Sequence, residues 1–198
     1  MVKKIILLML TLAALAVYPS HTQAQVANVG IERMTQESQI VVIGKVREIW
    51  ILTDEEKLRR FQTFDAIIGM VAELEIEELL LTADSKIIEK HAVKRSGAAL
   101  AVKIVIEEPL GRSESAGLLE DKRYLIFLRL RSINPDQYPH HSLYFPGTRM
   151  KKRKDFPEPD VSYFSMVRPP HGHILVDETT RWKVEEIRSY LREKSKRQ

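Results

Sequence analysis

Histidines in the C-terminal third of the chain are the residues whose types and spacing could do the most specific chemistry. His171 and His173 are two residues apart, so on a β-strand their rings would face the same side. Neutral imidazoles, together with a carboxylate, are ligands for zinc or another divalent ion. The sequence therefore allows a metal site built from His141, His171 and His173, although their spacing follows no established metal signature. The alternative is that these histidines lie in polar loops and hold nothing, and no cofactor is then expected.

A basic run precedes the last two histidines and has aromatic residues close to it. Positive charge beside aromatic rings is typical of surfaces that bind an anionic chain or headgroup. We nevertheless expect this run to form a solvated, mobile loop. The alternative is a binding site, and its ligand would then be an anionic glycan or lipid and no nucleic acid, because the start of the chain is typical of an exported protein, as described below. The cations of this run are Arg149, Lys151, Lys152, Arg153 and Lys154, and the nearby aromatic residues are Tyr144, Phe145 and Phe156.

Several other kinds of chemistry are excluded by the composition. With no cysteine, the chain cannot use disulfides, a thiolate nucleophile, thiolate zinc ligands or a lipid-modified N-terminal cysteine. It contains neither a G-x-S-x-G nucleophile motif nor a glycine-rich phosphate loop. The glutamates of residues 73–78 mostly alternate with apolar residues, which is typical of the solvent face of a strand. These observations favour a non-enzymatic interaction module over an enzyme.

The first residues are typical of a secretory signal peptide. Lys3 and Lys4 precede an apolar stretch over residues 5–17, and small side chains at Thr22 and Ala24 predict cleavage after Ala24. A membrane anchor is the alternative, but it needs about 20 apolar residues, more than this stretch offers. We therefore expect an exported protein, periplasmic or secreted, with no transmembrane anchor after cleavage of residues 1–24. Residues 25–198 would form one domain, and removal of Lys3 and Lys4 lowers the net charge from +4 to +2.

Residues 39–50 are the stretch around which the other elements are expected to assemble. The β-branched run from Ile40 to Ile43 predicts the first strand of a closed or nearly closed antiparallel barrel. Gly44 predicts a sharp bend, or a point where another backbone comes close. In the second strand the alternation slips near Glu77 and Glu78, which predicts a bulge. The further strands are expected over residues 71–81, 99–107, 122–131, 161–168 and 173–176.

A short helix is expected between the first two strands. Thr53 and Glu56 fit a capping box, and apolar residues continue at helical spacing as far as Ile68. An extended loop or long hairpin is the alternative. Residues 133–160, rich in proline, histidine, tyrosine and lysine, are expected to form a long excursion and not a second core.

A second helix is expected over about residues 180–196, at the end of the chain. Its apolar stripe consists of Val184, Ile187 and Leu191. We expect this stripe to pack on Val41 and Ile43, which lie on the face of the first strand opposite Ile40 and Val42. Docking of the stripe on a partner protein is the alternative.

The order of these elements resembles a known class of domain. An apolar strand that ends in Gly44-Lys45-Val46 is followed by the acid-alternating residues 72–79, then by residues 102–105, 122–128 and 172–176. This order is similar to that of exported bacterial proteins with an OB-type barrel akin to tissue-inhibitor and netrin-like domains. The resemblance implies a barrel. Together with the two helices expected above, we predict a mainly β fold, a single antiparallel OB-like barrel with an inserted short helix and a C-terminal helix packed on it. The inhibitors act through an N-terminal cysteine that this chain lacks, so no functional residue is carried over.

The expected function follows from the export signal and the barrel. We expect an exported, non-enzymatic β-barrel module that binds an envelope protein or another ligand. The alternatives are a metal-binding or metal-dependent envelope protein that uses the histidines, and a binder of anionic glycan or lipid surfaces through residues 149–154.

Overall fold

The computed structural model describes residues 30–61, 66–84, 86–95, 99–107, 117–146, 151–168 and 172–196. The predicted signal peptide therefore lies outside the described residues. The contacts of the chain divide it into two units, Met1–Arg33 and Met34–Gln198. Of the first unit only residues 30–33 are described, and helix α3 (Ile31–Glu37) begins there. All the described strands belong to the second unit.

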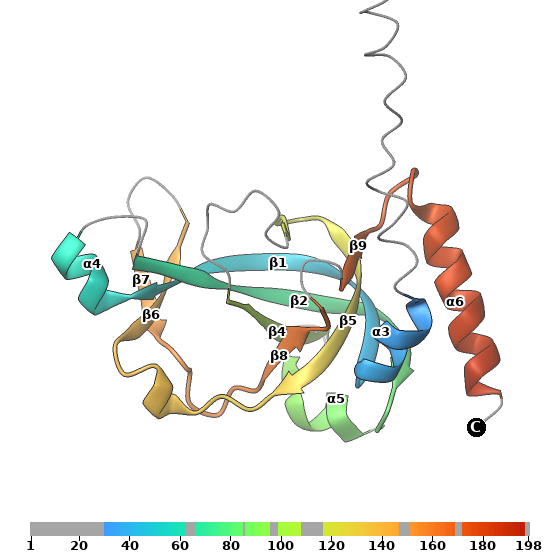
Figure 1. The fold of residues 1–198 in the computed structure, drawn as a ribbon, viewed down its shortest axis with the longest axis horizontal. Helices are drawn as coiled ribbons and strands as arrows, with labels where there is room; N and C mark the ends of the chain where they lie inside the picture. The colour runs from blue at the N-terminus through green and yellow to red at the C-terminus, as the bar shows by residue number, and fades with distance from the viewer. Residues whose placement is uncertain are drawn as a thin grey trace, which may run out of the picture. The chain divides into compact units, whose positions relative to one another are not determined.

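The second unit is mainly β, as the alternating sequence pattern predicts (Figure 1). Its strands are β1 (Ile40–Asp54), β2 (Ile67–Thr82), β3 (Val93–Lys94), β4 (Leu100–Ile106), β5 (Arg123–Arg131), β6 (His141–Phe145), β7 (Lys151–Asp155), β8 (Tyr163–Met166) and β9 (His173–Leu175). Its helices after α3 are α4 (Glu55–Phe61), α5 (Lys86–His91), the short 3-10 helix η2 (Pro135–Gln137) and α6 (Arg181–Ser195).

Five of the strands pair in a ring, so that the sheet closes partly on itself. The pairings run from β1 to β2, β4, β8, β5 and back to β1. Four of these pairings are antiparallel, as expected, but β4 and β8 run parallel. The sequence gives no warning of this pairing, because both strands are short and apolar patterns carry no strand direction. Beyond the ring, β6 and β7 extend the sheet from the far half of β1, and β9 pairs with β5.

The interior of the ring is the main hydrophobic core. It receives side chains from all five ring strands and from α5, and it is almost free of solvent. The predicted alternation is confirmed on β4, where Val102, Ile104 and Ile106 belong to this core and Val105 to the opposite face. On β5, Tyr124, Ile126 and Leu128 point inward in the same way.

Gly44 is a point of close backbone approach, as predicted. A Cβ atom at this position would lie 2.4 Å from the carbonyl oxygen of Glu75 and 2.8 Å from Cγ of Leu74. Glycine at this position therefore lets the backbones of β1 and β2 approach each other closely. The bulge predicted in β2 is also confirmed, because Ile43 pairs with Glu78 and Gly44 with Ile76, which leaves Glu77 without a partner on β1.

The helix between the first two strands is shorter than predicted and has a different cap. Thr53 lies inside β1 and is fully buried, so it is not the cap residue. The carboxylate of Asp54 accepts hydrogen bonds from the main-chain N–H groups of Glu56 and Lys57, at 3.0 and 3.1 Å. Ile68 belongs to β2, because the ladder with β1 extends to that end of the strand.

The described residues of 133–160 contribute to a second hydrophobic cluster, against expectation. Leu143 of β6 and Phe156 are buried with Trp50, Val105 and Tyr163 on the outer face of the ring strands. The prediction was wrong because the apolar residues of this segment are few and widely spaced. They nevertheless complete a cluster whose other half comes from the sheet.

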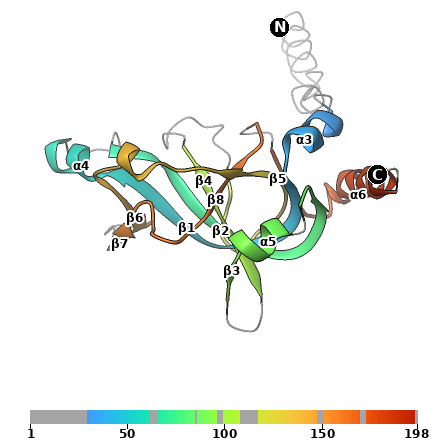
Figure 2. The same cartoon turned by 90° about the horizontal axis from the view of Figure 1, so that it is seen from below.

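Helix α6 confirms the predicted C-terminal helix and its buried stripe. Val184, Ile187 and Leu191 are each no more than 1% exposed. The guanidinium of Arg188 forms an ion pair with Glu78, which lies opposite Ile43 in the β1–β2 ladder. Helix α6 thus lies at one end of the sheet, whereas α4 and the β6–β7 hairpin lie at the other (Figures 1 and 2).

Candidate functional site

The histidines predicted as metal ligands lie in different parts of the sheet. His141 on β6 is opposite Asp54 at the far end of β1. His173 on β9 is opposite Ile126, which in turn pairs with Val42 near the start of β1. Twelve residues of β1 separate these two positions, about 40 Å of extended strand. The structure therefore does not bring His141 and His173 together, and His171 lies outside the described residues.

Each of these two histidines instead packs edge-on against a tyrosine. The ring centroids are 5.3 Å apart for His141 and Tyr138, and 5.5 Å apart for His173 and Tyr124. Burial lowers the pKa of the His141 imidazole. Among the residues that the structure describes, no three histidine or carboxylate side chains are close enough together to hold one metal ion.

The basic run is a paired strand and not a loop. Residues 151–155 form β7, which pairs with β6 and is an edge of the sheet. Lys151 is exposed, and none of the described carboxylates binds it. Arg149 lies outside the described residues. The three remaining cations are held by carboxylates: Lys152 by Glu55 and Asp155 at 2.6 and 2.7 Å, Arg153 by Glu48 at 2.7 Å, and Lys154 by Glu158.

Beneath β7, a row of ionisable residues runs across four strands. The ladder places Glu48 of β1 opposite Glu73 of β2, Glu73 opposite Lys103 of β4, and Lys103 opposite Tyr163 of β8. All four residues face away from the main core. Glu73 and Lys103 are 2% and 4% exposed, so both charges are almost removed from water. Buried charges of this kind need partners, because their desolvation is costly.

The residues that cover this row provide those partners. Lys103 Nζ lies 2.7 and 2.9 Å from the two carboxylate oxygens of Glu158, and Glu73 forms an ion pair with Arg95. Burial lowers the pKa of the Lys103 ammonium. Two cations lie over the Trp50 ring, with Lys103 Nζ at 5.1 Å and the Arg153 guanidinium at 4.0 Å from its centroid. These contacts hold the β5–β8 connection firmly on the sheet.

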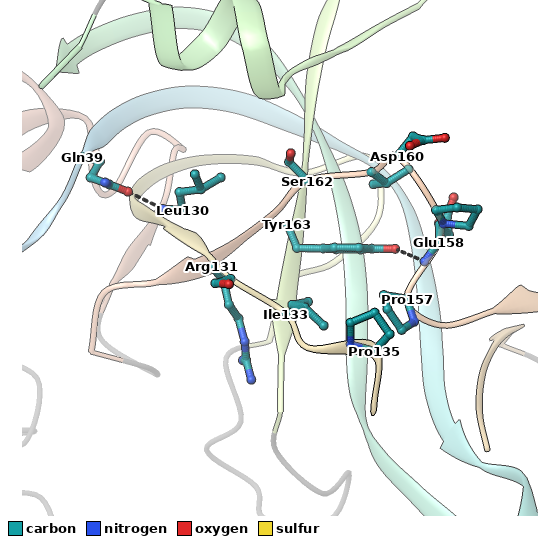
Figure 3. Close-up of a pocket in the computed structure, with 13 residues that line it drawn as sticks. Gln39, Leu130, Arg131, Ile133, Pro135, Pro157, Glu158, Asp160, Ser162 and Tyr163 are labelled. Carbon is teal, nitrogen blue, oxygen red and sulfur yellow. Dashed lines mark hydrogen bonds between the residues drawn. The ribbon is translucent and has the colours of Figure 1, made fainter. Parts of the chain in front are cut away.

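A groove of about 700 Å³, here called the β5–β8 groove, lies beside this row. Tyr163 is one of its lining residues, almost fully buried, and its hydroxyl accepts a hydrogen bond from the Glu158 main-chain N–H at 3.1 Å (Figure 3). Leu130, Ile133 and three prolines give the groove apolar walls, and polar side chains lie along its rim. A groove with apolar walls and a few polar groups is typical of a ligand site. Its lining residues are Gln39, Leu130, Arg131, Ser132, Ile133, Pro135, Pro157, Glu158, Pro159, Asp160, Val161, Ser162 and Tyr163.

A second depression of about 490 Å³, here called the Arg129 hollow, shares Leu130, Arg131 and Ser132 with the groove. Its other lining residues are Val105, Ile106, Glu107, Arg129, Ser165 and Met166. Arg131 is fixed at the boundary between the two, because its guanidinium lies 2.5 Å from Glu107 and donates to the Tyr138 hydroxyl at 3.2 Å. Burial raises the pKa of Tyr138, so this hydroxyl stays protonated at neutral pH.

The polar cluster around Glu55 ties the start of α4 to β6 and β7. Its carboxylate accepts hydrogen bonds from the hydroxyls of Ser142 and Tyr144, at 2.7 and 3.2 Å, and from Lys152. The hydrogen bond from Lys152, followed by that from Ser142, lowers the pKa of Glu55 to about 2. The cluster therefore stabilises the junction of three elements.

Sequence reasoning did not identify the groove or the hollow. Their residues are common types at irregular spacings, and they come together only because β8 inserts between β4 and β5. The only sequence signal for these two depressions is a few isolated polar residues near strand ends, such as Arg129 and Ser132. No family model matches the chain, and no curated protein is significantly similar to it. None of the described helices is long and apolar enough to cross a membrane.

Proposed function

We propose that this protein is an exported, non-enzymatic binding module with an OB-type barrel, and that its ligand binds in the β5–β8 groove. The export rests on the N-terminal sequence, with its two lysines, apolar stretch and predicted cleavage after Ala24. The barrel and the binding site rest on the arrangement of the strands and of the segment that joins β5 to β8.

The ring order supports an OB-type barrel. Counted along the chain, the ring strands are β1, β2, β4, β5 and β8, and the fifth lies between the third and the fourth. An OB barrel is likewise a five-stranded, partly open Greek-key arrangement in which neighbours in space are not always neighbours in sequence. A sheet that closes on itself also protects most of its strand edges.

The composition of the groove is the observation that carries the proposal. OB barrels bind ligands with the loop between strands one and two, the loop between strands four and five, and the face of strands two and three. In this ring, strands four and five are β5 and β8. Nine of the thirteen residues that line the groove belong to the connection between them, Ser132 to Ser162.

The face of strands two and three is itself already covered. On β4, Lys103 is bound by Glu158, and Val105 is buried under the cluster that contains Phe156. The connection between β5 and β8 thus occupies the surface on which other OB barrels place ligands. The β5–β8 groove lies at the edge of this connection and is exposed. We therefore assign ligand binding to the groove.

A bulky substitution in the groove tests this proposal. Ser132 is exposed and lines both the groove and the hollow, so Ser132→Trp would fill them without removing a core contact. Ser189→Trp, on the exposed face of α6, is the matched control. We expect an array of bacterial envelope glycans and peptides to contain a ligand that the unmodified protein and Ser189→Trp retain and Ser132→Trp loses. Equal retention by all three proteins would show that the groove is not the site.

A further inference from the structure

We propose that Arg129 binds the carboxylate of an acidic sugar, and that an acidic oligosaccharide lies across the Arg129 hollow and the β5–β8 groove. This inference rests on the proposed function and adds to it a ligand class and an anchoring residue. The proposed site does not include the basic strand β7, which the sequence suggested as the anion-binding surface.

Arg129 differs from the other arginines of the described strands, because none of the described carboxylates lies beside it. The described strands contain five arginines, and four of them lie within 2.7 Å of a carboxylate oxygen. Among the described residues, the only side chain to which Arg129 donates a hydrogen bond is Ser165, whose hydroxyl oxygen accepts from Nε at 3.3 Å. Because none of the described carboxylates neutralises Arg129, its guanidinium can bind an external anion.

The geometry of Arg129 suits a carboxylate. Arg129 and Arg131 lie two residues apart on the same face of β5, and both line the hollow. Because Nε of Arg129 is engaged by Ser165, its two terminal amino groups remain to donate to both oxygens of one carboxylate. The planar guanidinium fork matches a carboxylate in this bidentate way, which an ammonium group cannot do.

The one carboxylate among the described residues that line the hollow does not repel an anion, because its charge is compensated. Glu107 is held by Arg131 and by the Tyr138 hydroxyl. Below the neighbouring groove, Glu158 is held by Lys103 and Lys154. With these partners included, the charged groups of both depressions are the four cations Arg129, Arg131, Lys103 and Lys154 against the three acids Glu107, Glu158 and Asp160.

An oligosaccharide fits this surface better than a single small anion. The groove and the hollow share Leu130, Arg131 and Ser132, so a ligand of several units can lie across the end of β5. Both volumes fall within the range of about 300–1,000 Å³ that small-molecule sites occupy. The connecting loops of OB barrels bind oligosaccharides and oligonucleotides, and the proposed export of the chain favours the first class. The anionic unit would occupy the hollow and the next unit the groove.

Calorimetry with the full mature chain tests the inference, and trigalacturonate is the probe. Its methyl ester has nearly the same shape without the charge, and a tetraglutamate peptide carries the charge without the sugar. We compare the unmodified protein with Arg129→Gln, Ser132→Trp and Arg192→Gln. Arg129 is exposed, so its substitution should leave the fold intact, and Arg192 on α6 is an exposed arginine without a carboxylate partner among the described residues. Circular dichroism checks that every variant is folded.

We expect salt-sensitive binding of trigalacturonate, weakened about tenfold to a hundredfold by Arg129→Gln, the effect of losing a charge-assisted hydrogen bond. Methyl esterification should weaken it similarly, Ser132→Trp should abolish it, and Arg192→Gln should not change it. Unchanged affinity of Arg129→Gln, tighter binding of tetraglutamate, or no binding of trigalacturonate at millimolar concentration would each overturn the inference. If Arg129→Gln has no effect and Ser132→Trp still abolishes binding of the sugar or its ester, the groove remains the site and only the anion assignment fails.

Discussion

The ammonium group of Lys103 lies 2.7 and 2.9 Å from the two carboxylate oxygens of Glu158, although the residues are 55 positions apart in the chain. This contact fastens the connection between β5 and β8 to the outer face of β4. Glu158 also binds Lys154, so one nearly buried carboxylate neutralises two lysines. The groove wall formed by residues 157–162 depends on this arrangement for its position.

Glu158→Gln should therefore destabilise the protein strongly. It would leave two ammonium groups without a full negative charge, one of them almost completely buried, and breaking a buried pair costs about 3–5 kcal/mol. Urea unfolding followed by circular dichroism measures the loss. Glu193→Gln, an exposed glutamate on α6, is the control and should change stability by less than about 0.5 kcal/mol. A change as small for Glu158→Gln would contradict the assignment of a buried pair.

Stability should fall at acid pH because of Glu55. Its pKa is about 2 in the folded protein against 4.5 for a free glutamate, so the folded state favours the ionised form. The resulting stabilisation is complete above pH 4.5 and is lost as the pH falls through 2. It amounts to about 3 kcal/mol at most. Glu55→Gln should flatten the pH dependence of the unfolding free energy in this range, and an unchanged slope would show that Glu55 does not contribute.

Gly44→Ala should lower the stability of the ring itself. The added methyl group would lie 2.4 Å from the Glu75 carbonyl oxygen, a main-chain atom that cannot move without disturbing the β1–β2 ladder. Overpacking of this kind costs about 1–3 kcal/mol. Thermal unfolding should show a lower midpoint for the variant, whereas an unchanged midpoint would mean that β1 and β2 can separate locally at no cost.

The two tryptophans should report separately on the two ends of the molecule. Trp50 is fully buried and Trp182 is 65% exposed. In a Trp182→Phe protein the remaining emission should be insensitive to iodide, since only Trp50 contributes. Adding Arg153→Met removes the guanidinium that stacks on Trp50, which should cost about 1 kcal/mol or more and restore some quenching. Quenching that is strong before Arg153 is changed would contradict the burial of Trp50.

Most of the elements could be predicted from the sequence, because hydrophobic alternation determines which residues face a core. The strand at Ile40–Ile43, the bulge at Glu77 and the stripe of α6 follow from local patterns alone. The boundary of α4 could not be predicted, since pairing with β2 and β6 outweighs the helical spacing of residues 53–68. The groove and the hollow could not be predicted either, because Arg129, Ser132 and Tyr163 meet only through the insertion of β8 into the ring.

The pairing of β1 with partners far along the chain also limits the order in which the protein can assemble. The first half of β1 pairs with β5, where Ile40 is opposite Leu128. The second half pairs with β6, where Asp54 is opposite His141. Pairings of such long range form slowly. During synthesis β1 can pair with β2 early, but its other edge remains open until more than half of the chain has been made. Chains in this interval expose an unpaired strand edge, which is where incorrect association with another chain can begin.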